Sequence, residues 1–187
     1  MIKQFALSVW QMCDPLYFAC TRLQYVERHP QNIFRVRLLY YRGKSLQLRD
    51  GTIIQSGDLL LKIHLHNVRL LRQLLSYEGE IARSRQLYRL VERSLPGLAC
   101  YCADHPRSHE IKAIIGITQI NRGCAQLGFD VCNIHNVMYR TIKRLMLFPI
   151  HLLSVAQPFR SFCKHEPKLL LMSRDTLEWR YGQNAHR

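Results

Sequence analysis

Apolar and basic residues alternate in two stretches of the first half of the chain. At 34–38 every second residue is apolar and arginines stand between, and at 57–67 Lys62, His64 and His66 occupy alternate positions. Successive side chains of a β-strand point to opposite faces, so both stretches predict half-buried strands. The second strand therefore presents three nitrogen-bearing side chains on one face.

Turn signals between these two stretches predict a β-meander. Short apolar runs at 46–48 and 52–54 flank the Asp50-Gly51 pair, which is a typical hairpin turn. The basic strand, the two short runs and the histidine-bearing strand follow one another directly along the chain. We expect them to form consecutive antiparallel strands.

The rest of the chain alternates helical and strand patterns. We predict helices at 4–28, 68–75, 81–102, 137–156 and 173–181, and further strands at 112–120 and 168–172. This order predicts an α+β fold, with a mostly antiparallel sheet, an N-terminal β-meander and helices packed on one face. Nothing in the 187 residues marks an internal boundary, so we expect a single domain, 1–187, whose residues 1–30 form an N-terminal helical segment.

Positive charge is the strongest compositional signal. The chain has 27 Lys and Arg residues against 13 Asp and Glu residues, a formal net charge of +14, and 20 of the 27 are arginine. The planar guanidinium group suits phosphate and carboxylate oxygens. An anionic partner is expected, such as a membrane surface, a nucleic acid or an acidic polymer. The alternative is an ordinary solvated basic surface.

Cysteine and histidine usage predicts no metal site and leaves the cofactor open. None of the seven cysteines forms the paired CxxC units of a structural zinc site, and we expect reduced thiols in a cytosolic protein. A metal held by His64 and His66 needs a third ligand, and no spacing singles one out.

The sequence shows no convincing signal peptide or membrane span. The apolar run at 145–156 is well short of the roughly 20 residues that a spanning helix needs. We expect a cytoplasmic protein. A further hypothesis is that it contacts the inner face of the membrane as a peripheral protein. The candidate for this contact is 139–160, where Arg140, Lys143 and Arg144 precede an apolar run. The same stretch fits a core helix with its arginines in solvent.

Several short motifs together resemble the YkoP-like family. They are Gly57-Asp58, His64-Leu65-His66-Asn67, Ser84-Arg85, Leu95-Pro96-Gly97-Leu98, Lys112 to Thr118, Arg122-Gly123, Leu127-Gly128-Phe129 and Glu166-Pro167-Lys168. The family comprises small bacterial proteins and domains attached to NodB-type polysaccharide deacetylases. The resemblance implies a role near cell-envelope glycan chemistry. It transfers no catalytic residue, because deacetylation belongs to the attached domain.

The motif positions and the charge define a candidate ligand-binding face of His64, His66, Asn67, Arg85 and Arg122. We expect this face to bind an anionic lipid or glycan, in an accessory or binding role, and a polysaccharide deacetylase is a candidate partner. One alternative is an enzyme that acts on a lipid-linked or phosphorylated glycan, with His64 or His66 as general base. A further alternative, nucleic-acid binding, rests on charge alone and lacks stacking motifs.

Overall fold

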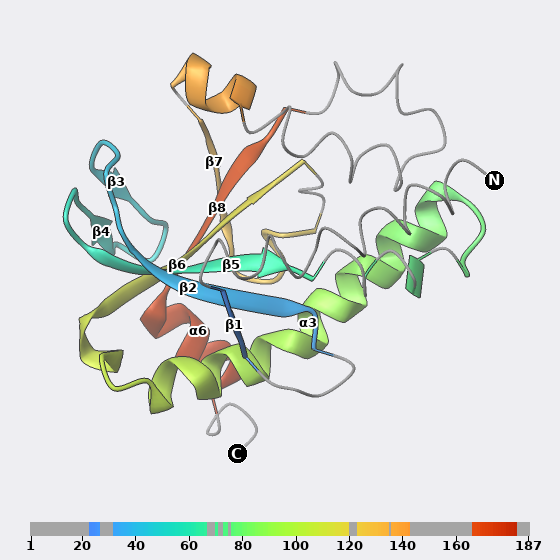
Figure 1. The fold of residues 1–187 in the computed structure, drawn as a ribbon, viewed down its shortest axis with the longest axis horizontal. Coiled ribbons are helices and arrows are strands. Elements are labelled where there is room, and N and C mark those ends of the chain that lie inside the picture. Colours follow the sequence, from blue (N-terminus) through green and yellow to red (C-terminus); the bar gives the residue numbers. More distant parts are fainter. Residues whose placement is uncertain are drawn as a thin grey trace.

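A mixed β-sheet runs through the computed structural model, which describes residues 23–26, 32–66, 70, 73–74, 76–119, 123–134, 136–142 and 166–182. Its strands are β1 (Gln24–Tyr25), β2 (Phe34–Tyr40), β5 (Leu59–Leu65), β6 (Ile111–Thr118), β7 (Asp130–Asn133) and β8 (Lys168–Ser173). The described strands form a six-stranded sheet in the order β1-β2-β5-β6-β8-β7 (Figure 1). Neighbours are antiparallel except for the parallel pair β5 and β6. The predicted α+β class, with a mostly antiparallel sheet, is confirmed.

Two helices cover one face of this sheet. They are α3 (Glu80–Asp104) and α6 (Arg174–Tyr181), and both lie on the same side of the strands (Figure 1). A parallel strand pair needs a crossover connection, and α3 lies in the segment that connects β5 to β6. A short 3-10 helix, η1 (Ser108–Glu110), precedes β6. The predicted packing of helices on one face is also confirmed.

The helix-side core follows from the apolar stripe of α3. Leu87, Leu90 and Leu98 recur at helical spacing and are buried against the odd-numbered positions of β5, including Leu61. Leu177 of α6 joins the same cluster. Gly79, predicted as a helix break, immediately precedes α3 with a positive φ of 83°. Sequence periodicity alone therefore located the main helix to within a turn.

The opposite face of the sheet is partly covered by a hairpin. Strands β3 (Leu46–Gln47) and β4 (Ile53–Ile54) form a separate two-stranded sheet. Leu48 and Ile54 pack with Leu60 of β5 in a second core cluster. The predicted meander therefore differs in one respect, because β2 pairs directly with β5 and the intervening hairpin folds over the sheet. Burial of the hairpin's apolar residues explains this arrangement.

The sequence did not predict the two edge strands of the sheet, β1 and β7. Gln24–Tyr25 lies within the segment predicted as helical at 4–28, and that prediction is wrong for these two residues because they pair with β2 as β1. The structure describes only residues 23–26 of that segment. Strand β7 pairs with β8 and reads as an ordinary loop in sequence. Strands this short are held by their neighbours, so local sequence carries little signal for them.

The remaining expectations concern termini of elements and membrane spans. Ser173 caps α6 as predicted, because its Oγ accepts a hydrogen bond from Thr176 N at 2.9 Å. Residues 137–142 are helical, and the other residues of the helix predicted at 137–156 lie outside the described part of the chain. Across the described residues, we find no helix with the length and apolar character needed to cross a bilayer.

Asp50, at the tip of the β3–β4 hairpin, fastens the hairpin to α6. Its carboxylate accepts hydrogen bonds from Ser173 Oγ and, at 2.8 Å, from Thr176 Oγ1, while Thr52 N donates to it at 2.9 Å. Burial alone would raise the pKa of Asp50, but these hydrogen bonds outweigh it and lower the pKa from 3.8 to about 2. The ionised carboxylate therefore stabilises the folded state.

We expect Asp50→Asn to lower the free energy of unfolding at neutral pH by about 1 kcal/mol, a value reduced for the exposure of the carboxylate. Because the folded pKa is depressed, the contribution is fully present above the unfolded pKa near 3.8 and disappears as the pH falls through about 2. Urea unfolding across this pH range measures it. The control is Asp104→Asn, at an exposed position at the end of α3. Equal destabilisation by both variants, or a difference independent of pH, would contradict the prediction.

Candidate anion-binding site

Four basic side chains lie side by side on the sheet face opposite the helices. Arg35 pairs with His64 across β2 and β5, and Arg37 pairs with Lys62 one step further along the same strands. Directly opposite residues of an antiparallel pair share a face. Their apolar neighbours, such as Val36, belong to the helix-side core, so the four basic residues point the other way. We call Arg35, Arg37, Lys62 and His64 the basic sheet face.

Two members of the basic sheet face are deeply buried. Arg35 is 3% exposed and Lys62 is 7% exposed, although cations are rarely buried to this degree. Like charges placed directly opposite each other in a sheet are in themselves destabilising. Arg37 and Lys62 form such a pair. Arg37 Nε is also buried without a hydrogen-bond partner. The arrangement concentrates basic side chains within a small area.

Tyr25 and His66 orient the guanidinium of Arg35. Arg35 Nη2 donates to Tyr25 Oη at 3.0 Å and lies 2.8 Å from His66 Nε2. The Arg35 guanidinium carbon is 5.1 Å from the centre of the Tyr25 ring, which meets the His66 ring edge-on at 6.0 Å. These contacts hold Arg35 in one orientation at the end of the basic sheet face.

The contact with Arg35 also determines the state of His66. A guanidinium group has only donors, so His66 Nε2 must accept this hydrogen bond through its lone pair. The imidazole that makes the bond is neutral and carries its proton on Nδ1. Its Nε2 is therefore engaged and does not serve as a free general base in this arrangement.

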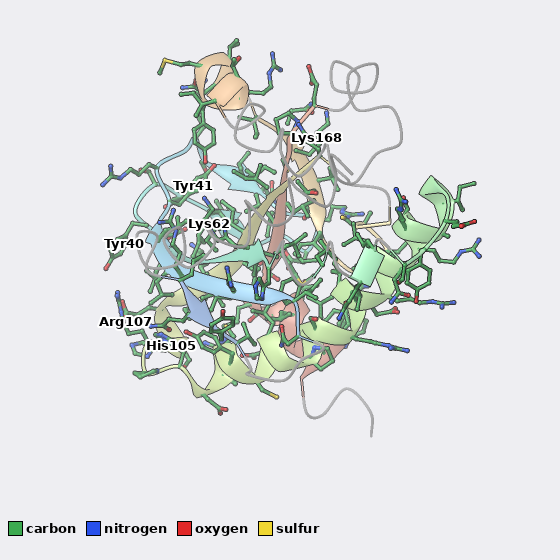
Figure 2. All side chains as sticks on the ribbon, turned by 45° about the vertical axis from the view of Figure 1, so that its right-hand side comes forward. Tyr40, Tyr41, Lys62, His105, Arg107 and Lys168 are labelled. Carbon is green, nitrogen blue, oxygen red and sulfur yellow. The ribbon has the colours of Figure 1, made fainter. Side chains whose placement is uncertain are left out.

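Tyr139 borders the basic sheet face from the helical residues 137–142. Burial raises the pKa of Tyr139, and the positive charge of Arg37 opposes that rise, which places the phenol within electrostatic reach of the guanidinium. Arg140, the next residue, forms an ion pair with Glu166 at 3.8 Å. Figure 2 shows Lys62 well separated from Arg107 and His105, which follow the C-terminal end of α3.

The structure brings together part of the predicted ligand-binding face. His64 and His66 both lie next to Arg35. Arg85 lies exposed on α3, which covers the opposite face of the sheet, and no contact is found between it and the histidines. Asn67 and Arg122 lie outside the described residues.

Arg35 and Arg37 are the site residues that sequence reasoning missed. The signal was present, because these arginines alternate with apolar residues at 34–38 just as Lys62 and His64 do in the later strand. Their proximity to the histidine-bearing strand depended on β2 pairing directly with β5. The meander prediction placed two short strands between them.

Thiol and metal chemistry receive no support from the described residues. Among the described cysteines, Cys100, Cys102 and Cys132 are free thiols. Burial raises the pKa of Cys102 and Cys124 to about 11, so both thiols stay protonated at neutral pH. In the part of the chain that the structure describes, no group of three or more His, Cys, Asp or Glu side chains is placed to hold a metal ion.

Comparison with known proteins points to one family. The profile of a family described as the YkoP domain matches residues 3–181. A relative from Bacillus subtilis (strain 168), "Uncharacterized protein YkoP", is 42% identical over 149 residues, which are 80% of this chain and 81% of that protein. No solved structure matches. The family match extends over the described sheet and over α3 and α6. The name of the relative states no activity.

We expect His66→Leu to lower the free energy of unfolding by about 1–3 kcal/mol, because the buried Arg35 donor loses its acceptor. His66→Gln should recover part of this loss, since its amide oxygen can reach the position of Nε2. Urea unfolding at neutral pH measures both variants. His109→Leu is the matched control, because the His109 side chain is 79% exposed. Equal effects of His66→Leu and His66→Gln would show that the hydrogen bond is unimportant.

Proposed function

The chain belongs to the YkoP domain family, and we propose that it binds an anionic ligand, a lipid or a glycan, on its basic sheet face. The observation that carries the proposal is the cross-strand pairing of Arg35 with His64 and of Arg37 with Lys62 on one face of the sheet. The pairing brings several cationic donors together within one small area of the sheet. The binding energy then comes from a charge arrangement that the fold itself keeps in place.

The donor set supports a phosphate or carboxylate group as the recognised chemistry. Guanidinium groups bind such oxygens through paired, charge-assisted hydrogen bonds, and an ammonium such as that of Lys62 has three further donors. Arginine and lysine can also donate to the hydroxyl oxygens of a neutral sugar, but their hydrogen bonds to a phosphate or carboxylate are stronger. We therefore expect the basic sheet face to recognise the charged group of the ligand.

The state of His66 supports binding rather than catalysis. Its Nε2 lone pair is used by Arg35, and a general base must have a free lone pair within reach of the proton that it removes. In this role His66 is a positioning residue for Arg35. The family resemblance supports an accessory role in cell-envelope polysaccharide metabolism, with a polysaccharide deacetylase as a proposed partner.

We expect Arg37→Gln and Lys62→Gln each to weaken binding of an anionic ligand about tenfold or more, because each removes one charge-assisted hydrogen bond. Isothermal titration calorimetry at low salt with soluble probes measures this. Suitable probes are glycerol phosphate, a short-chain phosphatidic acid and a glucuronic acid oligosaccharide. The probe that binds most tightly then identifies the chemical class.

The matched control for these substitutions is Arg42→Gln, an equal change of charge at an exposed residue between β2 and β3. Urea unfolding of all three variants separates loss of the site from loss of the fold. Binding that is equally weakened by Arg42→Gln would reduce the effect to net charge. Binding unaffected by all three would place the ligand elsewhere and end the proposal.

A further inference from the structure

The outer surface of the helical layer carries a second basic region, and we propose that it docks the protein on an anionic membrane. Arg85, Arg89 and Arg93 follow one another at four-residue intervals on the exposed side of α3. At about 1.5 Å of rise per residue, the three side chains span roughly two turns of helix. We call them the arginine row.

The arginine row differs from Arg107 and Arg174 in lacking partners. Arg107 and Arg174 form close ion pairs with Glu110 and Glu178. Within the part of the chain that the structure describes, no hydrogen bond or ion pair is found for the three members of the row. Like charges at this spacing repel each other along a helix. All three guanidinium groups are thus available to an external anion.

Exposed apolar side chains accompany the arginine row. Ile81 stands one turn before Arg85 and is 76% exposed. Trp179 of α6 is also 76% exposed. Leu177 of the same helix is buried in the helix-side core, and Trp179, two residues later, lies on the opposite side of the helix and faces outward. Both helices lie on the same side of the sheet (Figure 1), with Ile81 near the N-terminal end of α3 and Trp179 on α6.

The combination favours a membrane surface over a nucleic acid. Arginines near a bilayer are attracted to anionic headgroups, and tryptophan is enriched at the level of those headgroups. Phosphates of a nucleic acid would satisfy the arginine row, but they would leave Ile81 in water and give it no partner. The net charge of +14 adds a general attraction toward an anionic bilayer.

This surface is separate from the basic sheet face. The helices cover one side of the sheet, and Arg37 and Lys62 point to the other side. Membrane docking through the arginine row therefore does not rest on the proposed function. It also differs from the membrane contact predicted at 139–160, of which the structure describes residues 139–142.

Tryptophan fluorescence provides a direct test, because the chain has two tryptophans, Trp10 and Trp179. In the full-length Trp10→Phe variant, Trp179 is the sole reporter. We expect vesicles of phosphatidylglycerol mixed with phosphatidylcholine to shift its emission to the blue, and brominated lipids to quench it. Vesicles of phosphatidylcholine alone should do neither. Unchanged emission with the anionic vesicles, while the protein sediments with them, would exclude Trp179 from the contact and overturn the proposal.

Vesicle sedimentation tests the arginines in a chain that keeps both tryptophans, so it does not depend on the Trp10 substitution. We expect Arg85→Gln combined with Arg89→Gln to weaken binding to anionic vesicles about tenfold or more. Arg42→Gln combined with Lys44→Gln removes the same charge from exposed positions between β2 and β3 and should change binding far less. Equal losses in the two double variants would reduce the effect to net charge and overturn the proposal.

Two further outcomes are decisive. If Arg140→Gln abolishes vesicle binding and the arginine-row variant does not, the contact lies at 139–160 and the proposal fails. If the arginine row is needed for binding single-stranded DNA while anionic vesicles fail to bind, the partner is a nucleic acid. The soluble-probe titrations of the basic sheet face are unaffected by either result, so failure of one proposal is distinguishable from failure of the other.

Discussion

The antiparallel register of β2 and β5 is the constraint on which the rest of the structure depends. It runs without interruption from Phe34 opposite Leu65 to Tyr40 opposite Leu59. Side chains alternate along both strands, so this register sends most of the apolar residues to the helices and the basic residues to the other face. A slip by one residue would turn the arginines of β2 into the helix-side core. The core and the basic sheet face are thus two consequences of one pairing.

Positive charge plays different physical roles on the two sides of the sheet. On the basic sheet face it is concentrated and partly buried, where a low dielectric strengthens a hydrogen bond to a charged group. On the arginine row it is exposed and screened, which suits weak attraction to an extended surface. A protein with both features can hold a small anionic group on one side while its helical layer rests against a charged surface.

Sequence reasoning succeeded where local pattern and tertiary environment agree. The apolar stripe of α3, the serine cap of α6 and the isoleucine-rich strand β6 each carry their signal within a few residues. It failed at Gln24–Tyr25, where pairing with β2 overrides the local pattern. The candidate site was predicted only in part, because tertiary pairing again decided what the local pattern did not show. The spacing of His64 and His66 in the sequence identified them as candidates. The arginines of β2 lie next to β5 only because β2 pairs directly with β5 and the β3–β4 hairpin is left out of this pairing.

By itself the sequence determined the α+β class, the alternation that separates basic from apolar residues in each strand, and the excess of positive charge. These follow from periodicity and composition, which are local or additive properties. Only the tertiary structure decided which basic residues lie together, because strand partners are chosen by burial of the whole apolar surface. It paired Arg37 with Lys62, turned His66 toward Arg35, and placed Arg85 behind the sheet, away from the histidines.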